Sequence, residues 1–138
     1  MVADASRLRF YVDETSIGLG LALARARTDV VHVGHPLVPE LTRGLLDPER
    51  MPRVTARDLV VLGRDRHLHT RPGERELFAQ YGLRVFRLAG RKDVSTWDAI
   101  VRLVRHWEQI EQLLRDRPAG PWIYGIFETR LTELPLRR

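Results

Sequence analysis

The chain has 138 residues, a formal net charge of +5 and 43% hydrophobic residues, which suits one compact domain with its own core. It contains no cysteine, and this excludes disulfides, zinc–thiolate centres and cysteine nucleophiles. The sequence has neither a membrane-length apolar stretch nor a signal-peptide pattern, so we expect a cytoplasmic protein without a membrane span.

Arginine dominates the positive charge. All of the 23 basic residues except Lys92 are arginine, and arginine side chains bind phosphate groups through two parallel hydrogen bonds. The composition would therefore suit a nucleic-acid ligand. A bias in genome composition explains the same dominance equally well, and charge alone names no partner.

Short apolar runs alternate with helical patterns along the first half of the chain. The runs predict strands at 9–12, 29–33 and 59–62. Helices are predicted at 17–27, at 36–46 after Pro39, and at 48–57 with Asp47 as N-cap and Pro48 in the first turn.

The second half of the chain predicts a helix at 72–82, a strand at 84–88 and a long helix at 95–116. Ser95 and Asp98 resemble a capping box at the start of the long helix. One apolar face of this helix is predicted to consist of Trp97, Ile100, Val104, Trp107, Ile110 and Leu114, with both tryptophans as core anchors. The segments 122–128 and 131–136 predict a terminal hairpin.

Strands that alternate with helices predict an α/β fold. We expect a single three-layer α/β/α domain over residues 1–138, with a mainly parallel sheet and a C-terminal hairpin. In such sheets, ligands bind beyond the carboxyl ends of the strands, near the point where the strand order reverses. The residues that directly follow each strand are therefore the first candidates for a functional site.

Acidic residues occupy several of these positions. Asp13 and Glu14 follow the first strand, Asp65 comes soon after the third, and Asp47 and Glu49 lie at a predicted helix start. If the first and third strands are neighbours, Asp13 and Asp65 converge, and clustered carboxylates repel each other unless a cation or a proton compensates. Carboxylate oxygens favour Mg²⁺ or Mn²⁺. The pattern indicates an acidic metal site in a basic surface, as phosphodiester cleavage would use.

Two of these acids also have a structural explanation. Helix capping alone would explain Asp47. Asp65 could pair with Arg64 or Arg66 within a turn, where aspartate is common. Asp13 is harder to explain by stability alone, because it is one of two adjacent acids after an apolar strand.

Three segments in order, "FYVDET", "LLDPERMPRV" and "DLVVLGRDRHLHTRPGERELFAQYGLRVFRLAG", resemble the PIN-like nuclease domains, in particular short relatives of the VapC-type toxins. In that group an opening strand ends in Asp-Asp or Asp-Glu. A later strand ends in Thr-Arg-Asp, before a basic stretch and Arg-Pro-x-Glu. The likeness continues through the helix with Trp97 and Trp107 to the closing "GPWIYGI".

The resemblance implies a metal-dependent endoribonuclease, the toxin of a toxin–antitoxin pair, with RNA as substrate and an antitoxin protein as inhibitor. It implies that Asp13, Asp47 and Asp65 are the catalytic ligands of Mg²⁺ or Mn²⁺. Glu14 and Glu49 would be supporting acids, and Glu49 could replace Asp47. Arg64, Arg66 and Arg71 are expected to contact the RNA phosphates.

Two departures from the family pattern bear on how well the site is ordered and how fast it works. Gly63 stands where the family usually has threonine, and Arg50 stands where it often has tryptophan. Both departures leave the carboxylates intact.

Two other functions are compatible with the sequence. A receiver-like phosphoacceptor domain would use Asp65 as its acceptor, but it needs a lysine after the last parallel strand, and Lys92 follows the fourth strand instead. A catalytically inactive domain that binds nucleic acid or a partner protein is the other alternative. The terminal hairpin and an exposed apolar helix face would also suit a homodimer.

Overall fold

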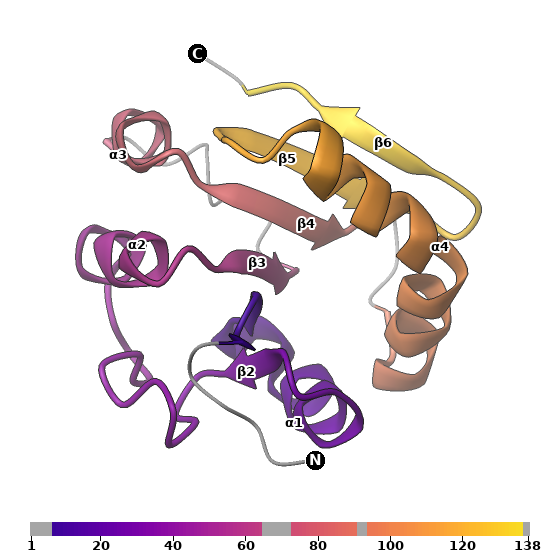
Figure 1. Ribbon diagram of the computed structural model, residues 1–138, viewed down its shortest axis with the longest axis horizontal. Helices are drawn as coiled ribbons and strands as arrows, with labels where there is room; N and C mark the ends of the chain where they lie inside the picture. The colour runs from indigo at the N-terminus through magenta and orange to yellow at the C-terminus, as the bar shows by residue number, and fades with distance from the viewer. Residues whose placement is uncertain (1–6, 65–72, 91–93, 137–138) are drawn as a thin grey trace.

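The computed structural model describes residues 7–64, 73–90 and 94–136. Within these ranges, one six-stranded sheet has the order β2-β1-β3-β4-β5-β6 (Figure 1). Its strands are β1 (Phe10–Val12), β2 (Val30–His32), β3 (Val60–Gly63), β4 (Arg84–Leu88), β5 (Trp122–Ile126) and β6 (Leu131–Leu134). All pairs are parallel except β5 and β6, which form an antiparallel hairpin. The predicted mainly parallel sheet with a terminal hairpin is confirmed.

Helices cover both faces of the sheet. They are α1 (Ile17–Ala26), α2 (Asp47–Ala56), α3 (Glu74–Tyr81) and α4 (Thr96–Asp116), with a short 3₁₀ helix, η2 (Glu14–Ser16), after β1. Figure 1 shows α2 and α3 together on one side and α1 and α4 on the other. Tyr11 packs into the core under α2 and α3, whereas Phe10 and Val12 pack into the core under α1 and α4, as alternation along a strand requires. The predicted three-layer α/β/α arrangement is confirmed.

The helix predicted at 36–46 does not form. This segment runs through turns between β2 and α2, and Gly44 has a positive φ of 80° that no right-handed helix contains. Val38 and Leu41 are nevertheless fully buried. Their apolar character reflects a turn that packs on the core, and a short apolar run does not by itself distinguish such a turn from a helical face.

The start of α4 is as predicted, but its predicted apolar face is partly wrong. The Ser95 hydroxyl accepts a hydrogen bond from the Asp98 backbone N–H at 3.1 Å. Trp97 and Val104 are 71% and 73% exposed, so Trp97 is not a core anchor. Trp107 does pack inward, with its ring centroid 5.2 Å from that of Phe10. The buried face consists of Ala99, Leu103, His106 and Ile110. Two adjacent stripes of this helix are apolar, and periodicity alone does not decide which one meets the sheet.

A buried carboxylate ties several elements together at the amino-terminal edge of the sheet. Asp29 accepts hydrogen bonds from Arg27 at 2.8 and 3.0 Å and from Arg9 at 3.3 Å. Arg9 also pairs with Glu111 of α4 at 2.9 Å, and the Arg27 guanidinium lies 4.5 Å from the ring centre of Trp107. Burial acts to raise the pKa of Asp29, but hydrogen bonds and charge from the two arginines outweigh it and hold the pKa below its ordinary value of 3.8.

We expect Asp29→Asn to lower the free energy of unfolding by about 1–3 kcal/mol at neutral pH, because it weakens charge-assisted hydrogen bonds. The folded-state pKa of Asp29 is lowered, so its carboxylate contributes stability above the unfolded pKa. That contribution is lost as the pH falls through the folded pKa. The difference in stability between the variant and the wild type should therefore shrink below about pH 4.

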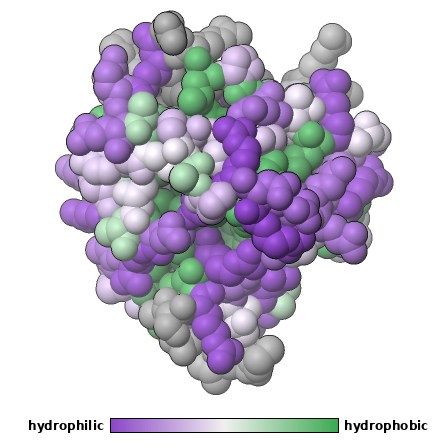
Figure 2. Space-filling view, turned by 45° about the horizontal axis from the view of Figure 1, so that its top comes forward, coloured by the Kyte–Doolittle hydropathy of each residue, from purple (hydrophilic) through white to green (hydrophobic). Residues whose placement is uncertain are grey.

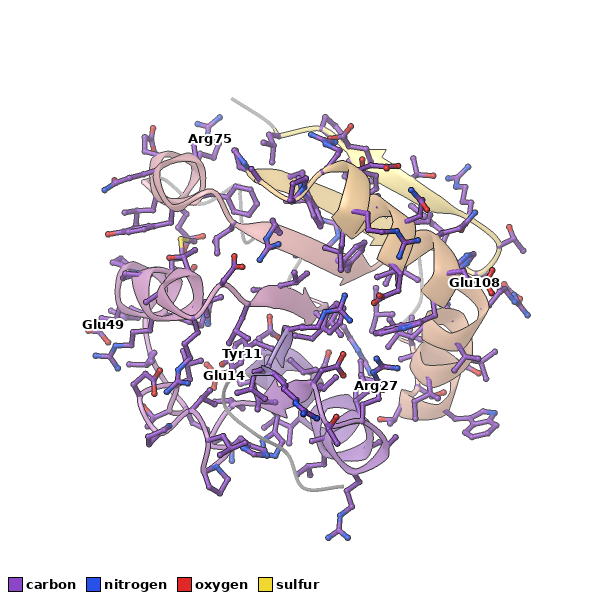
Figure 3. The ribbon with its side chains drawn as sticks, viewed as in Figure 1. Tyr11, Glu14, Arg27, Glu49, Arg75 and Glu108 are labelled. Atoms are coloured by element: carbon purple, nitrogen blue, oxygen red, sulfur yellow. The ribbon has the colours of Figure 1, made fainter. Side chains whose placement is uncertain are left out.

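Denaturant unfolding at neutral and acidic pH measures this difference. Glu108→Gln is the matched control, because Glu108 is an exposed carboxylate on α4 (Figure 3). A difference between Asp29→Asn and the wild type that stays constant down to about pH 2 would contradict the assignment.

Candidate functional site

The strand order reverses at β1, and this point defines the candidate site. β1 has β2 on one side and β3 on the other, and all three strands are parallel. Val12 is in register with Leu62, which places Asp13 level with Gly63 at the carboxyl edge. The predicted adjacency of the first and third strands is confirmed. Open α/β sheets bind ligands beyond the carboxyl ends at such a reversal.

Some predicted site residues cannot be placed relative to this edge. Asp65, Arg66 and Arg71 lie outside the described residues, as does Lys92 of the phosphoacceptor alternative.

Asp13 is buried where β1 ends. Only 4% of its surface is exposed. One carboxylate oxygen, Oδ1, accepts a hydrogen bond from the Thr15 backbone N–H at 3.0 Å and another from the Thr15 hydroxyl. Asp13 thereby caps η2, and its own backbone N–H donates to the Leu62 carbonyl at 3.2 Å. Asp13 is difficult to explain by stability from the sequence alone. In the structure, local hydrogen bonds hold it rigidly.

Thr15 is a site residue that the sequence analysis missed. Its hydroxyl donates to Asp13 and accepts a hydrogen bond from the Arg64 backbone N–H at 3.1 Å. It therefore connects the end of β1 to the residue that follows β3. The spacing Asp-x-Thr after a strand is the available sequence signal, because aspartate commonly binds the backbone N–H two residues later.

Gly63 provides the space that the Asp13 carboxylate occupies. A Cβ atom at position 63 would lie 2.5 Å from Asp13 Oδ2 and 2.7 Å from Oδ1, well inside van der Waals contact. The glycine in place of the family's usual threonine therefore admits the carboxylate. The orienting hydroxyl comes instead from Thr15, on the neighbouring chain segment.

Asp47 is also buried, but it is not the N-cap that we predicted. The N-cap of α2 is Leu46, without a side-chain hydrogen bond, and Asp47 is the first helical residue. Its carboxylate forms an ion pair with the Arg50 guanidinium, three residues later in α2. The Asp47 and Arg50 side chains are 4% and 15% exposed, so this pair is largely shielded from water.

Tyr11 lies within the electrostatic reach of both features. Burial raises the pKa of Tyr11 to about 12. The charge of Arg50 acts in the opposite direction, and the charges of Asp13 and Glu14 add to the increase. The phenol is therefore neutral at physiological pH. The charges of Arg50, Asp13 and Glu14 therefore all act on the same buried phenol.

The structure separates the two supporting acids. Glu14 accepts a hydrogen bond from the Gly44 backbone N–H at 3.3 Å, which links η2 to the turn before α2. Glu49 is exposed, and Figure 3 places it on the outer side of α2, away from Tyr11 and Glu14. Of the two acids at the start of α2, Asp47 is therefore buried and Glu49 is exposed.

Arginines continue along the same carboxyl edge. Arg64 follows β3 and is partly buried, and Arg87 is in register with Gly63 on β4. Arg102 of α4 donates to the carbonyl of Ala89, which follows β4, at 2.6 Å, and to that of Ile126, which ends β5, at 3.1 Å. The buried acids of β1 and α2 thus lie at one end of an edge that is positively charged farther along.

The described acids have the chemistry that a divalent cation prefers, but too few of them lie close together to bind one. Carboxylate oxygens are the ligands that Mg²⁺ and Mn²⁺ prefer. In the part of the chain that the structure describes, no three His, Cys, Asp or Glu side chains gather closely enough to hold a metal ion. Asp47 is moreover already paired with Arg50. The predicted ligand set therefore depends on Asp65.

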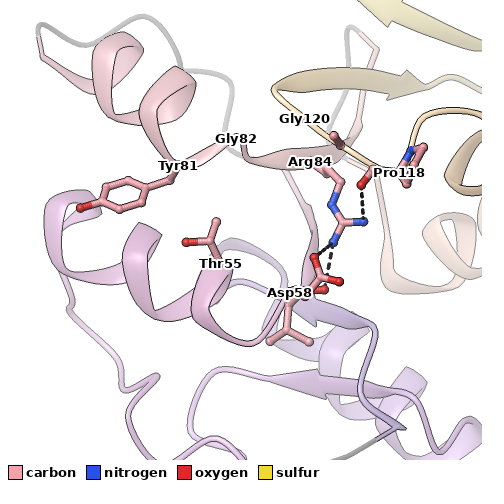
Figure 4. Close-up of a pocket in the computed structure, with 9 residues that line it drawn as sticks. Thr55, Asp58, Tyr81, Gly82, Arg84, Pro118 and Gly120 are labelled. Atoms are coloured by element: carbon pink, nitrogen blue, oxygen red, sulfur yellow. Dashed lines mark hydrogen bonds and ion pairs between the residues drawn. The ribbon is translucent and has the colours of Figure 1, made fainter.

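A pocket of about 310 Å³ lies at the opposite, amino-terminal edge. Arg84 lines it and donates to the carbonyl and carboxylate of Asp58 at 2.9 and 2.8 Å, and to the Pro118 carbonyl at 3.2 Å (Figure 4). Its guanidinium thus joins the segments that precede β3 and β5. Because this cation already holds the fold together, the carboxyl edge remains the better candidate site.

The face of the molecule in Figure 2 is mostly hydrophilic, and its hydrophobic residues form small separate patches. Within the described ranges, no helix combines the length and the apolar character that crossing a membrane requires.

Comparison with known proteins identifies a family. A family model described as "PIN like domain" matches residues 8–90, more than half of the chain. The matched stretch contains Asp13, Asp47 and Asp65, and it ends before α4, β5 and β6. No curated protein and no solved structure matches the chain. The resemblance to PIN-like domains is confirmed, and the narrower relation to VapC-type toxins stays a prediction.

We expect Gly63→Ala to destabilise the protein by about 1–3 kcal/mol, because the added Cβ displaces the Asp13 carboxylate from its contacts with Thr15. A double-mutant cycle with Asp13→Ala isolates this effect. The penalty of Gly63→Ala should largely disappear in the Asp13→Ala background, as measured by denaturant unfolding of all four proteins. An equal penalty in both backgrounds would show that the carboxylate is not what excludes a side chain at position 63.

Proposed function

We propose, because the chain belongs to the family of PIN-like domains, that it is a metal-dependent nuclease that hydrolyses RNA phosphodiesters. The observation that carries this proposal is the buried Asp13 carboxylate at the reversal point of a parallel sheet, held by Thr15 over the end of β3. A carboxylate fixed at this position suits ligand chemistry more than packing.

The proposed ligands of Mg²⁺ or Mn²⁺ are Asp13, Asp47 and Asp65, with Glu14 as a supporting acid. The second supporting acid of the sequence analysis, Glu49, is less suitable because it is exposed on the outer side of α2. A metal ion bound here would activate a water molecule and stabilise the negative charge that develops on the phosphate.

The neighbouring residues have distinct roles in this proposal. Thr15 orients Asp13 through two hydrogen bonds. Tyr11 remains a neutral phenol because its pKa is raised to about 12, so it adds no negative charge to the site. Arg64 follows β3 at the same edge, and we assign it to the neutralisation of an RNA phosphate. Arg66 and Arg71 are proposed to extend this contact.

These observations bear differently on the two alternative functions, a phosphoacceptor domain and an inactive binding domain. The family match favours a nuclease over a receiver-like phosphoacceptor. A catalytically inactive binding domain draws support from the buried pair of Asp47 and Arg50, because that pair occupies one proposed ligand. The role as a toxin, an antitoxin partner, a homodimer and a cytoplasmic location remain predictions.

We expect the purified protein to cleave RNA only with Mg²⁺ or Mn²⁺ and to lose this activity in EDTA. Asp13→Asn should reduce the rate of cleavage at least ~100-fold, because it removes one ligand charge. The variant should stay folded, because asparagine keeps an oxygen that can accept the hydrogen bonds from Thr15. Cleavage of a labelled RNA under single-turnover conditions measures both effects.

Asp116→Asn serves as the control for this experiment, since Asp116 is an exposed acid at the end of α4. Full metal-dependent cleavage by Asp13→Asn would place the activity at another site. RNA binding without any cleavage by the wild type would instead identify the inactive binding domain.

We further expect Arg64→Gln to weaken RNA binding uniformly across sequences. Each phosphate contact releases about one counterion, so the slope of log K against log salt concentration should fall by about 0.7–1. Fluorescence anisotropy at several salt concentrations measures this slope. Arg115→Gln is the matched control, because Arg115 is exposed near the C-terminal end of α4. An unchanged slope in Arg64→Gln would remove Arg64 from the interface.

A further inference from the structure

Trp97 leaves most of its ring in water at the start of α4. It is 71% exposed, whereas Trp122 is fully buried and Trp107 packs against Phe10. Tryptophan is highly buried on average, because its large apolar surface is favourable to remove from water. Packing in the core therefore does not explain this residue, and a ligand that covers the ring would.

The start of α4 places Trp97 at the same end of the sheet as the candidate site. α4 begins at Thr96, after the segment that follows the carboxyl end of β4. A Cβ atom on Gly18 would lie 2.9 Å from the Thr96 hydroxyl oxygen, so the first turn of α4 packs against the first turn of α1 (Figure 1). α1 in turn follows Asp13 through η2. Trp97, the next residue after Thr96, therefore belongs to the same end of the molecule as Asp13.

Two arginines of α4 add positive charge at this end. Arg102 and Arg105 donate to backbone carbonyl groups at the carboxyl end of β5 and in the turn beyond it. A carbonyl group has no net charge, so these contacts hold the guanidinium groups in place without cancelling their attraction for phosphates. Asp98 is the acid in the first turn of α4, and its charge disfavours a phosphate directly at Trp97. The ring is thus left to an uncharged, flat group.

We propose that Trp97 is a stacking platform for an unpaired base of RNA that is bound along the carboxyl end of the sheet. This inference rests on the proposed action on RNA, and it adds that the RNA is single-stranded where it meets α4. An aromatic side chain accepts any base, because every base has a π-face. A base inside a duplex is already stacked between its neighbours and does not reach the ring.

A second protein chain is the competing occupant of this surface. The exposed apolar residues on this stripe of α4 are Trp97, Val101 and Val104, which lie on one helix face at their spacing. A protein interface of standard size uses about 20–30 residues from each partner, so the stripe is small for one. The positive charge nearby favours an anionic ligand with apolar faces, and single-stranded RNA combines both properties.

The test measures RNA binding in EDTA, so that it depends neither on a metal ion nor on cleavage. Fluorescence anisotropy compares a labelled single-stranded RNA of mixed sequence with the same RNA annealed to its complement. Trp97→Ala should weaken binding of the single strand at least ~5-fold and leave binding of the duplex within about twofold. Because stacking releases no counterion, the slope of log K against log salt concentration should not change, in contrast to Arg64→Gln.

Two further variants separate the π-face from apolar surface in general. Trp97→Phe keeps a ring and should retain the single-strand affinity within about threefold of the wild type. Val104→Ala is the matched control, because Val104 is 73% exposed on the same stripe but has no ring, and it should bind as the wild type does. The proposal is overturned if Trp97→Ala binds the single strand as tightly as the wild type, if it weakens single strand and duplex equally, or if the wild type binds neither RNA.

Tryptophan fluorescence gives a second measurement on the unmodified chain. Single-stranded RNA should quench the emission of the wild type, because a stacked base contacts the exposed Trp97 ring. Trp97→Phe should bind the RNA but lose this quenching, and quenching that persists in Trp97→Phe overturns the proposal. So does a dimer in analytical ultracentrifugation that Trp97→Ala dissociates while its RNA affinity stays unchanged. Single-strand binding that depends on Trp97, without metal-dependent cleavage, would refute the proposed function and leave this inference standing.

Discussion

A carboxylate that leaves water must be compensated, and this constraint organises the carboxyl edge of the sheet. Asp13 and Asp47 are both buried, and different partners compensate the charge of each. Two donors from Thr15 hold Asp13, and the Arg50 guanidinium pairs with Asp47. Gly63 contributes as well, because the absence of a side chain at this position leaves room for the Asp13 carboxylate.

Buried charge is also compensated at the amino-terminal edge of the sheet, where the ion pairs connect elements of the fold. Asp29 is buried there, but Arg9 and Arg27 satisfy it, and Arg9 also joins it to α4. Arg84 fixes two other segments at this edge through carbonyl groups. These contacts connect elements of the fold at the amino ends of the strands, and none lies at the carboxyl ends where the strand order reverses. Position in the topology, more than burial of charge, therefore separates the candidate site from the structural ion pairs.

The part of the chain beyond the family match completes the molecule. The match ends at residue 90, yet β5 adds to the sheet beside β4, and α4 covers the same face as α1. Arg102 of α4 binds carbonyl groups at the ends of β4 and β5. The C-terminal third thus extends both the core and the basic character of the edge that begins at Asp13.

The sequence by itself determined the α/β class, the six strands of the described sheet and the acids that follow the strands. Short apolar runs and helix caps can be read from the sequence because they depend on neighbouring residues. Ser95 caps α4, as the sequence predicts. Tertiary structure alone decided which stripe of α4 faces the sheet, and it turned the apolar segment at 36–46 into packed turns. It also decided the environment of each acid. The hydroxyl that orients Asp13 and the cation that pairs with Asp47 depend on how side chains meet in space, and no periodicity in the sequence reports that.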